Sequence, residues 1–544
     1  MRTNAYILLL LLTLNCNNIF SQTFTRVIHA GGNLPDAGLA IASARDGSLY
    51  VTGYFQDETE FSGIKIKASG AEDIFLAKYD TKSGLQWIRT AGSSYVKQGF
   101  ILEKGTSVTT DRNDNVIIAG TFTGNAVFEN NNLNSKGMED IFVAKYSPEG
   151  TMQWIKQYGG MYHDLTEAVA CDSKNNIVLC GSYQNKLTTD DAELETNGMA
   201  CFITKINRNS STLWLRQIEG NDYSIGKSVV TDDAGNVYIT GHFSGNIIVG
   251  DRQFVSNGFS DIFVVAYSYT GDLLWFRQFG SSKDDSGTGL CMMQGCLYLT
   301  CTFSDKLSIN SITIGTPGSE GILLIKMNLH GNTERVYNFG GTYCRSAAIT
   351  ASKNNSIVLC GSFGGGLKFG NTSLVSQGVE DIFIACCDTV LHPQWITGAG
   401  NEFNDRAYGI ISGNNNELFC TGSFCGSIMF GDQVLSSAGS EDIFLVSLNE
   451  SYISSITETI VPIDTGIIDI YPNPFRNKFH VELKNGMNAD YIRITDISGK
   501  EIERRSILES LLYEFDLTGK SSSTYIIEVY SDGKLVFSGK LVKE

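Results

Sequence analysis

A unit of about 60 residues recurs seven times along this 544-residue chain. Its clearest marker is the tetrapeptide Glu-Asp-Ile-Phe, and successive Asp positions of the marker are 67, 60, 61, 60, 60 and 61 residues apart. A Gly stands two or three residues before each marker. The Asp position is occupied in order by Asp73, Asp140, Ala200, Asp261, Gly321, Asp381 and Asp442. A period of this length indicates repeats that either stack into a solenoid or close into a ring.

Each unit contains about four candidate strands. One precedes a turn such as Asp46-Gly47, a second ends in Gly as at Gly53, a third begins at the marker, and a fourth contains Trp. All five tryptophans (Trp87, Trp154, Trp214, Trp275 and Trp395) stand fourteen residues after a marker position. This regularity favours packing between units over a cofactor stack. With 57 Gly and only 18% charged residues, the composition also predicts an all-β fold of short strands and tight turns.

The two ends of the repeat region distinguish a ring from a solenoid. Residues 26–32 align with the Trp-type strand at 154–160, so one such strand is in excess at the start. After Asp442 the same strand is missing. A solenoid needs capping repeats, whereas a ring lets an N-terminal strand complete the last unit. We therefore expect residues 23–450 to form a seven-bladed β-propeller that is closed by its N-terminal strand.

A resemblance to a known family supports this expectation. Residues 232–241 read Asp-Asp-Ala-Gly-Asn-Val-Tyr-Ile-Thr-Gly, which resembles the seven-bladed β-propeller repeats common in bacterial secreted proteins. The resemblance covers residues from about 24 to about 450. It implies a fold and carries no single activity.

The first 22 residues have the pattern of a secretory signal peptide, with Arg2 before an apolar run from Tyr6 to Leu14. Cys16 raises a lipoprotein alternative. No run approaches the ~20 apolar residues of a spanning helix, so no transmembrane segment is expected. The other twelve cysteines would meet an oxidising compartment, but their spacing does not assign disulfide pairs. Cys180 and Cys360 occupy the same position of two repeats, which suggests small buried side chains.

The repeats stop near residue 450, and a Ser/Thr/Ile-rich linker (451–466) leads to a different C-terminal module at 467–544. Alternating apolar runs in this module predict a small, immunoglobulin-like β-sandwich. Three short segments resemble the C-terminal sorting domain of type IX secretion found in Bacteroidetes; their motif residues are Tyr471, Pro472, Asn473, Pro474, Gly499, Lys500 and Lys540. The resemblance implies recognition by the type IX machinery at the outer membrane, with the cargo secreted or attached to the cell surface. An ordinary accessory domain is the alternative.

Charge excludes one class of partner. The chain carries a formal net charge of −17, which repels phosphate backbones and argues against nucleic-acid binding. Residues 467–544 hold 11 basic and 12 acidic residues, a net of −1, so residues 1–466 carry −17 + 1 = −16. The acidity therefore belongs to the repeat region.

Candidate binding residues come from two features. Asp36, Asp164, Asp285 and Asp405 each follow by five residues the glycine that opens a Gly-rich turn, so they would line a funnel or brace the turn. An insertion at 95–104 lengthens the first interval to 67 residues and contains Phe100 and Ile101. Insertions into single repeats often mark a binding face, although a plain longer loop is the alternative.

Metal and catalytic motifs are sparse. Residues 111–115 alternate oxygen ligands as a calcium loop does, but Phe122 stands where the distal Glu would be. Calcium is therefore a minor alternative, and the six His show no metal-ligand spacing. No nucleophile elbow, P-loop or catalytic Cys/His signature is present. We hypothesise a non-enzymatic binding or adhesion module for a glycan or protein. The alternatives are a glycan-degrading enzyme that uses Asp164 and Glu167, and a structural subunit of a surface assembly.

Overall fold

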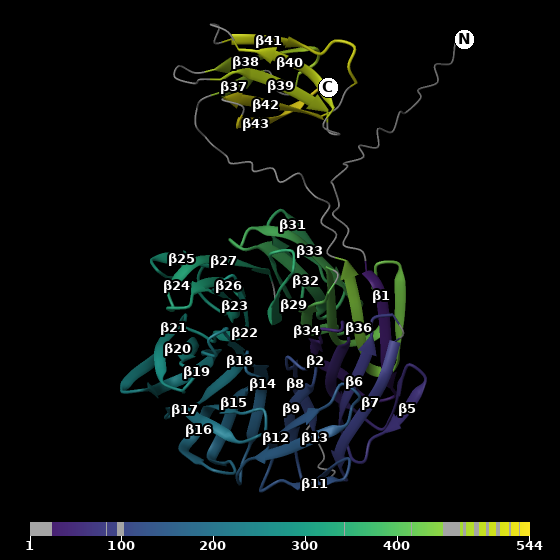
Figure 1. Ribbon diagram of the computed structural model, residues 1–544, viewed down its shortest axis with the longest axis vertical. Helices are drawn as coiled ribbons and strands as arrows, with labels where there is room; N and C mark the ends of the chain where they lie inside the picture. The colour runs from purple at the N-terminus through teal and green to yellow at the C-terminus, as the bar shows by residue number, and fades with distance from the viewer. Residues whose placement is uncertain are drawn as a thin grey trace, which may run out of the picture. The chain divides into compact units, whose positions relative to one another are not determined.

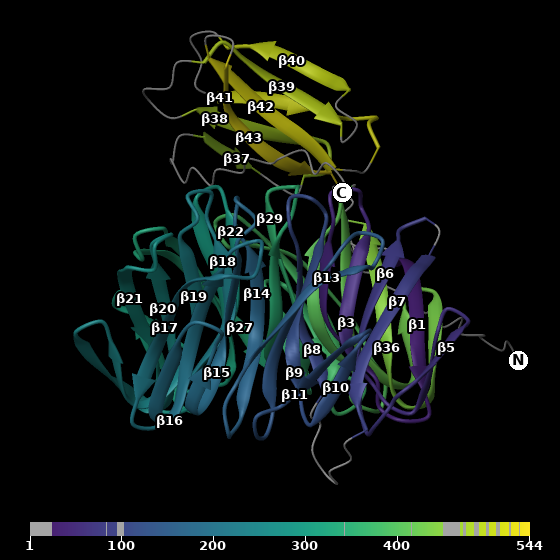
Figure 2. The same ribbon diagram turned by 60° about the horizontal axis from the view of Figure 1, so that its bottom comes forward.

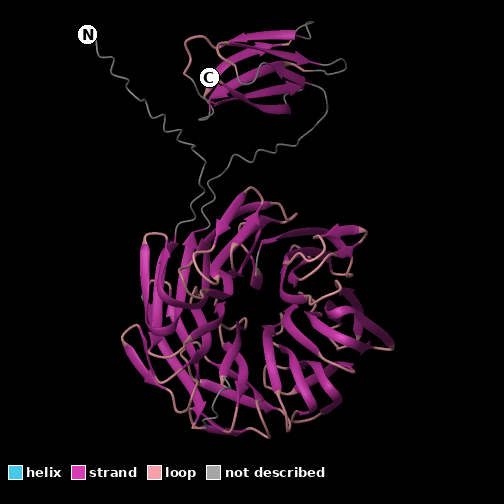
Figure 3. Cartoon of the chain, turned by 180° about the vertical axis from the view of Figure 1, so that it is seen from behind, coloured by secondary structure: helices cyan, strands magenta, loops and turns pink. Residues whose placement is uncertain are grey.

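The computed structural model describes residues 24–82, 84–94, 103–341, 343–414, 416–449, 468–471, 475–483, 489–496, 500–507, 512–521, 524–531 and 534–543. Across these ranges the regular elements are all β-strands (Figure 3), which confirms the all-β expectation. No helix in the described part of the chain could span a membrane. Contacts divide the chain into two compact units, Met1–Ser451 and Tyr452–Glu544, which we describe separately. The expected signal peptide and linker lie outside the described residues.

Each repeat of the larger unit builds an antiparallel sheet of four main strands around a common centre (Figure 1). The first strand lies innermost, and the second, third and fourth follow outward. A short hairpin projects between the second and third strands. The innermost strands β2, β8, β14, β18, β22, β28 and β34 each contact the next, and β34 also contacts β2.

The first three repeats comprise β2 (Ala37–Ser43), β3 (Leu49–Phe55), β4 (Glu58–Phe61), β5 (Ile64–Lys67), β6 (Asp73–Asp80), β7 (Gly84–Ser93); β8 (Lys104–Thr110), β9 (Val116–Phe122), β10 (Asn125–Phe128), β11 (Asn131–Asn134), β12 (Asp140–Tyr146), β13 (Met152–Tyr158); and β14 (Asp164–Cys171), β15 (Ile177–Thr188), β16 (Glu193–Ile206), β17 (Thr212–Gly220). In the third repeat the hairpin is continuous with β15 and β16, and the fourth and seventh repeats share this feature.

The remaining repeats comprise β18 (Ser224–Thr231), β19 (Val237–Val249), β20 (Arg252–Tyr267), β21 (Leu273–Phe279); β22 (Ser286–Met293), β23 (Cys296–Phe303), β24 (Leu307–Ile309), β25 (Ile312–Ile314), β26 (Gly321–Asn328), β27 (Thr333–Gly341); β28 (Arg345–Ala351), β29 (Ser356–Phe363), β30 (Gly366–Phe369), β31 (Thr372–Val375), β32 (Asp381–Asp388), β33 (Pro393–Ala399); and β34 (Arg406–Ser412), β35 (Glu417–Phe430), β36 (Gln433–Asn449). The long strands of the larger unit run along one common direction (Figure 2).

The N-terminal strand β1 (Phe24–Gly32) is the outer strand of the last repeat. It pairs antiparallel with β36, placing Val27 opposite Val446 and His29 opposite Phe444. β1 continues past this sheet and pairs with the hairpin strand β4 of the first repeat. Equivalent pairs join β7 to β10, β17 to β19, and β27 to β30. At these four junctions, strand pairing therefore links neighbouring repeats at their outer edges.

The tryptophan positions form a second link between neighbouring repeats. The indole nitrogen of Trp214 donates to the backbone carbonyl of Tyr269 at 3.1 Å, in the third-to-fourth-strand turn of the next repeat. A Cβ on Gly271 in that turn would lie 2.8 Å from the indole ring, and Gly271 has φ +87°. Glycine is needed there because any Cβ would collide with the indole and because other residues rarely adopt this positive φ. Arg26 stands at the Trp position of the last repeat and donates to the carbonyls of Asp80 and Thr81 in the first.

The second and third strands of each repeat are buried on both faces and supply most of the core. Tyr50, Phe75, Phe142 and Phe202 are fully enclosed there. Nine of the twelve cysteines from Cys171 to Cys425 are buried. Cys180 and Cys360 have no solvent exposure and pack in hydrophobic clusters, as expected for cysteines that act as small apolar side chains.

The smaller unit contains two antiparallel sheets, β37-β38-β41 and β40-β39-β42-β43. Its strands are β37 (Ile468–Tyr471), β38 (Lys478–Leu483), β39 (Tyr491–Asp496), β40 (Glu501–Ser506), β41 (Leu512–Asp516), β42 (Thr524–Ser531) and β43 (Lys534–Val542). One hydrophobic cluster takes Phe479 and Phe515 from the first sheet and Ile494 and Val529 from the second. The alternating apolar residues of the sequence face this shared core.

Candidate functional site: the central channel

Every innermost strand contains a β-bulge at the same position. The register shifts by one residue between Gly38 and Ala40, and equivalent shifts occur in each of the other six strands. A bulge leaves one residue unpaired and redirects its side chain. The seven bulge residues are Leu39, Thr106, Glu167, Lys227, Thr288, Ala347 and Tyr408.

All seven bulge residues line one cavity of about 260 Å³, which the innermost strands of the larger unit surround. The repeats share their glycines, marker residues and strand pairing, yet no two bulge residues other than Thr106 and Thr288 are the same. The seven bulge residues are consequently one acid, one base, two threonines, one tyrosine and two aliphatic residues. A symmetric scaffold with an asymmetric cavity wall has the character of a ligand site, in which a few polar groups fix orientation and apolar groups supply contact area.

Of the two roles expected for the four recurring aspartates, lining a funnel or bracing a turn, their hydrogen bonds support the second. Asp36, Asp164, Asp285 and Asp405 have at most 1% exposure and are not among the residues that line the cavity. Each carboxylate accepts a hydrogen bond from a backbone N–H four residues earlier, at 2.6 Å from Gly160 for Asp164 and at 2.9 Å from Asn401 for Asp405. They brace the turns that enter the innermost strands.

At the insertion, the position of these aspartates is occupied by a buried glutamate, Glu103, which sequence analysis did not identify. Glu103 stands two residues before Gly105, just as Asp164 stands two before Thr166, at the pairing position of the strand glycine. Its carboxylate accepts hydrogen bonds from Ser93 N–H at 2.8 Å and from the Ser93 hydroxyl. The insertion separates Glu103 from its glycine, and this displacement hid the equivalence. Phe100 and Ile101 lie outside the described residues.

These carboxyls pair with the marker aspartates of the preceding repeat. The five combinations are Asp442 with Asp36, Asp73 with Glu103, Asp140 with Asp164, Asp261 with Asp285, and Asp381 with Asp405; in each, the charge of the first acts on the second. In the two repeats without a marker aspartate, the residue paired with Ala200 is Ser224, and the residue paired with Gly321 is Cys344. Both members of a pair are acidic or neither is, so the pair acts as one structural unit.

Burial is the main cause that raises the pKa of these carboxyls, and the neighbouring marker aspartate adds to it. The values are about 6 for Asp285, about 7 for Asp36 and Asp405, and about 8 for Glu103 and Asp164. The marker aspartates also explain an adjacent glycine. A Cβ on Gly159 would lie 2.3 Å from Cγ of Asp140, so a side chain there would collide with the carboxyl.

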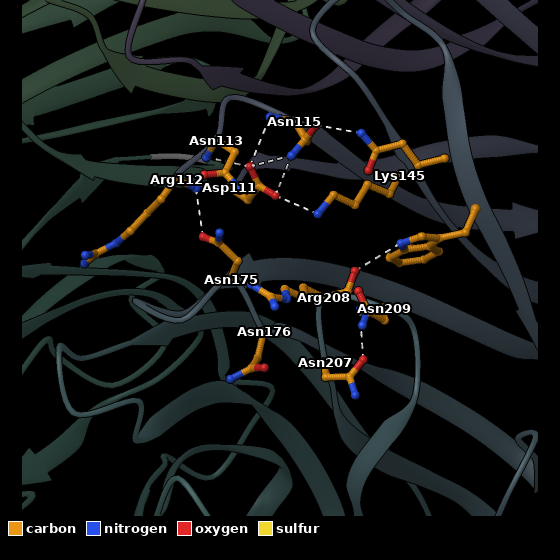
Figure 4. A network of polar contacts seen from close by, with 12 residues as sticks. Asp111, Arg112, Asn113, Asn115, Lys145, Asn175, Asn176, Asn207, Arg208 and Asn209 are labelled. Atoms are coloured by element: carbon orange, nitrogen blue, oxygen red, sulfur yellow. Dashed lines mark hydrogen bonds and ion pairs between the residues drawn. The ribbon is translucent and has the colours of Figure 1, made fainter.

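The calcium-like loop at 111–115 holds an ammonium group instead (Figure 4). Nζ of Lys145 lies 2.7 Å from Oδ2 of Asp111, and both side chains are almost fully buried. Asp111 also accepts from the backbone N–H groups of Asn113 and Asn115. Burial pushes the pKa of Asp111 up, but the hydrogen bonds from Lys145 and Asn115 outweigh it and the pKa is lowered. Because these donors occupy the carboxylate, we do not place calcium here.

The described sorting-motif residues lie on strands or at a turn. Tyr471 ends β37 and is 44% exposed. The backbone N–H of Lys500 donates to the carboxylate of Asp496 in the turn before β40, and Lys540 pairs with Ile526 in β43. Pro472, Asn473, Pro474 and Gly499 lie outside the described residues.

Comparisons with known families agree with both sequence resemblances. Residues 469–544 match the Secretion system C-terminal sorting domain family, and residues 213–247 match the Beta-propeller repeat family. The chain therefore carries a sorting domain of type IX secretion and β-propeller repeats. The sorting domain assigns the protein to the outside of the cell, either released or on the surface, and implies handling by the type IX machinery.

Two curated relatives share part of this sequence. The uncharacterized WD repeat-containing protein L264 of Acanthamoeba polyphaga mimivirus is 24% identical over 244 residues, covering 37% of this chain and 17% of the relative. The regulatory protein FlaEY of Caulobacter vibrioides is 24% identical over 399 residues, covering 68% of this chain and 40% of the relative. The chain thus spans less than half the length of either protein.

Similar solved structures include several enzymes, at low similarity. The lignostilbene dioxygenase of Pseudomonas brassicacearum is 10% identical with a TM-score of 0.35, over 78% of this chain and 95% of that one. The PQQ-bound aldose sugar dehydrogenase of Streptomyces coelicolor is 9% identical with a TM-score of 0.33, over 79% and 98%. Likenesses this distant carry no argument about what this chain does.

Proposed function

We propose that residues 23–450 form a seven-bladed β-propeller closed by β1, and that the exported protein is a non-enzymatic binding module whose ligand, a glycan or a protein, enters the central channel. Closure is supported by the contacts that run from β2 through each innermost strand to β34 and back to β2. Closure is also supported by Arg26 in the outer strand of the last repeat, which donates a hydrogen bond to a backbone carbonyl of the first repeat. Trp214 of the third repeat makes the equivalent contact with the fourth. We propose in addition that residues 467–544 form an immunoglobulin-like sandwich.

The observation that carries the binding role is the varied set of bulge residues around one cavity. Seven equivalent positions project into the same space, and their side chains differ where the rest of the repeat does not. A ring with a purely structural role would not require different side chains at equivalent positions. A ligand site does require them, because a few polar groups among apolar ones fix the orientation of the ligand.

The glycan-degrading alternative has less support. Its two suspected carboxyls would have to face each other across the cavity, about 5–10 Å apart. Asp164 is fully buried in a turn, and Glu167 is engaged in an ion pair with Lys227 at 2.7 Å. A structural subunit of a surface assembly remains a third proposal, which predicts co-purification with a partner at fixed stoichiometry.

The test is capture of glycans and secreted proteins by the exported chain, compared with a variant whose channel is filled. Ala347→Trp places a large side chain at a bulge position that lines the cavity. Met429→Trp is the matched control, because Met429 is 59% exposed on the hairpin of β35 and lies away from the cavity. We expect Ala347→Trp to abolish capture and Met429→Trp to leave it intact. Equal capture by all three proteins would refute channel binding.

A further inference from the structure

The channel has one ionic side. Glu167 and Lys227 alone among the seven bulge residues carry charge, and they stand on adjacent strands, β14 and β18. Nζ of Lys227 lies 2.7 Å from Oε1 of Glu167, and the two side chains are 30% and 28% exposed. The two side chains therefore neutralise each other, and both remain accessible from the cavity that they line.

A neutral hydrogen-bonding pair stands on the two strands β19 and β22. Nδ1 of His242 is 2.9 Å from the hydroxyl of Ser286. Neither residue lines the cavity, but the charges of Lys227 and Glu167 both act on the pKa of His242. Burial, reinforced by the positive charge of Lys227, lowers the pKa of His242 to about 4. The imidazole is therefore neutral at physiological pH, with one nitrogen that donates and one that accepts.

The opposite wall is apolar. Around the ring of contacting strands, β34 lies across from β14 and β18, with β28 and β2 on either side of it. The bulge residues of these three strands are Tyr408, Ala347 and Leu39, which line the same cavity. A ligand in the channel thus meets an ion pair on one side, and one aromatic and two aliphatic side chains on the other.

We infer that the channel binds a neutral polyhydroxylated ligand, a sugar unit of a glycan, with its hydroxyls on Glu167 and Lys227 and its apolar face on Tyr408; this inference rests on the proposed binding function. A charged ligand would have to separate an ion pair that already neutralises itself, and would lose that attraction. Hydroxyls need not do so. They donate to free lone pairs of the carboxylate and accept from the remaining N–H bonds of the ammonium.

The charge of the repeat region disfavours one competing class. Residues 1–466 carry a net charge of −16, so an acidic sugar or a phosphate approaches against repulsion. The negative charge of the repeat region would attract a cationic ligand from a distance. In the channel, however, the ammonium of Lys227 would repel it, because Lys227 lies beside the only carboxylate among the bulge residues, Glu167. Neutral hydroxyls avoid both costs, which is why the arrangement favours them.

The experiment measures saturation-transfer NMR and titration of the full exported chain with methyl glycosides of glucose, galactose and mannose. Methyl glucuronide and glucosamine serve as the anionic and cationic comparisons. We expect at least one neutral glycoside to bind, and to bind at least tenfold more tightly than either charged sugar. The inference is overturned if no neutral glycoside gives a signal or if a charged sugar binds more tightly.

Two channel variants locate the binding. Glu167→Gln combined with Lys227→Met removes both charges together and leaves no unpaired one, and we expect at least tenfold weaker binding of the neutral glycoside. Lys156→Met with Asp190→Asn, which removes an ion pair outside the cavity, is the control and should leave affinity unchanged. If the double channel variant fails to fold, Tyr408→Leu should weaken binding on its own. Unchanged affinity in the folded channel variants would overturn the inference.

Failure of this inference and failure of the binding function look different. If no glycoside binds but Ala347→Trp still abolishes capture in the experiment above, the channel binds something other than a neutral sugar. If Ala347→Trp has no effect on capture either, the channel is not the binding site at all.

Discussion

Nε2 of His29 lies 2.6 Å from Oδ2 of Asp442, a residue 413 positions further along the chain. His29 belongs to β1, and Asp442 is the marker aspartate of the last repeat. Gln157 makes the equivalent contact with Asp140 within the second repeat, at 2.7 Å. The contact between the first described strand and the last repeat is thus of the same kind as a contact inside one repeat.

Removing that strand should open the ring. Deleting residues 23–30 exposes the edge of β36 from Ile443 to Leu448 and takes away the His29 and Arg26 contacts. An unpaired edge strand promotes association between chains. We expect oligomers or aggregates by size-exclusion chromatography, and a lower unfolding midpoint in denaturant. A monomeric deletion variant with the stability of the intact protein would disprove closure.

Stability should fall as the pH rises from about 4 to about 8. The pKa of Asp164 is raised by burial from 3.8 to about 8, so its proton is held more tightly in the folded state. The stability that this proton contributes is complete below pH 3.8, the pKa in the unfolded chain. It is lost as the pH rises to about 8, the pKa in the folded protein. Each such carboxyl adds a slope of up to ~1.4 kcal/mol per pH unit to the free energy of unfolding.

Denaturant unfolding at pH 5, 6.5 and 8 measures this slope. Asp164→Asn should reduce it, because the amide keeps a hydrogen-bond acceptor for Gly160 but does not titrate. His242 acts in the opposite sense below about pH 6.5, since its pKa is lowered to about 4 and its contribution is lost on protonation. Stability that increases from pH 5 to pH 8 would contradict the assignment of the raised carboxyl values.

The tryptophans should differ in what they contribute. Trp214 is 6% exposed and packs on Gly271, so Trp214→Ala should cost ~3–5 kcal/mol. Trp154 is only partly buried, although it makes the same hydrogen bond, to the carbonyl of Arg208 at 3.2 Å. We expect Trp154→Ala to lower the free energy of unfolding by only ~1–2 kcal/mol, because less buried surface is lost than at Trp214. Equal losses in the free energy of unfolding would show that the hydrogen bond, rather than burial, sets the cost.

Lys145 should behave as a buried counter-ion. Lys145→Met leaves the carboxylate of Asp111 buried without its ammonium and should cost ~3–5 kcal/mol in the free energy of unfolding. Adding Asp111→Asn to the same chain should recover part of this loss. The intact protein should show no shift of its melting temperature with calcium, and a calcium-dependent increase would reverse our interpretation of this loop.

The sorting domain should be separable from the ring, because the two compact units have their own cores. A chain truncated after residue 455 should fold and remain in the periplasm. Residues 467–544 fused to an unrelated secreted reporter should carry it out in a host with type IX secretion. Fractionation and circular dichroism of both proteins provide the measurement, and normal export of the truncated chain would refute the role of this domain.

Periodicity made the strand order and the inter-repeat role of tryptophan accessible from sequence, because both depend on residues that recur at a constant spacing. The alignment of residues 26–32 with 154–160 placed Arg26 at the tryptophan position. Its contact with the next repeat could not be predicted, since a guanidinium and an indole share only an N–H donor and an apolar stem. The bulge residues were missed for a related reason. Their common property is a one-residue register shift in the backbone, while their side chains differ from repeat to repeat.

The candidate aspartates were recognised as a recurring set, but their direction was not accessible. A period-two strand pattern predicts which face a residue occupies. Asp36, Asp285 and Asp405 lie one residue before the innermost strand and Asp164 is its first residue, so all four sit where a turn meets a strand and the pattern does not apply. Glu103 shows the same limit, because the insertion displaces it from the spacing that defines the set.

The pairs β1–β4, β7–β10, β17–β19 and β27–β30 have a mechanical consequence. Each outer strand is hydrogen-bonded to its own sheet and to the hairpin of the next, so a pull on one sheet is shared with its neighbour. Bonds loaded in parallel resist shear better than bonds that break one after another. A protein outside the cell meets flow and proteases, and at these four junctions the outer strand is held by hydrogen bonds on both sides.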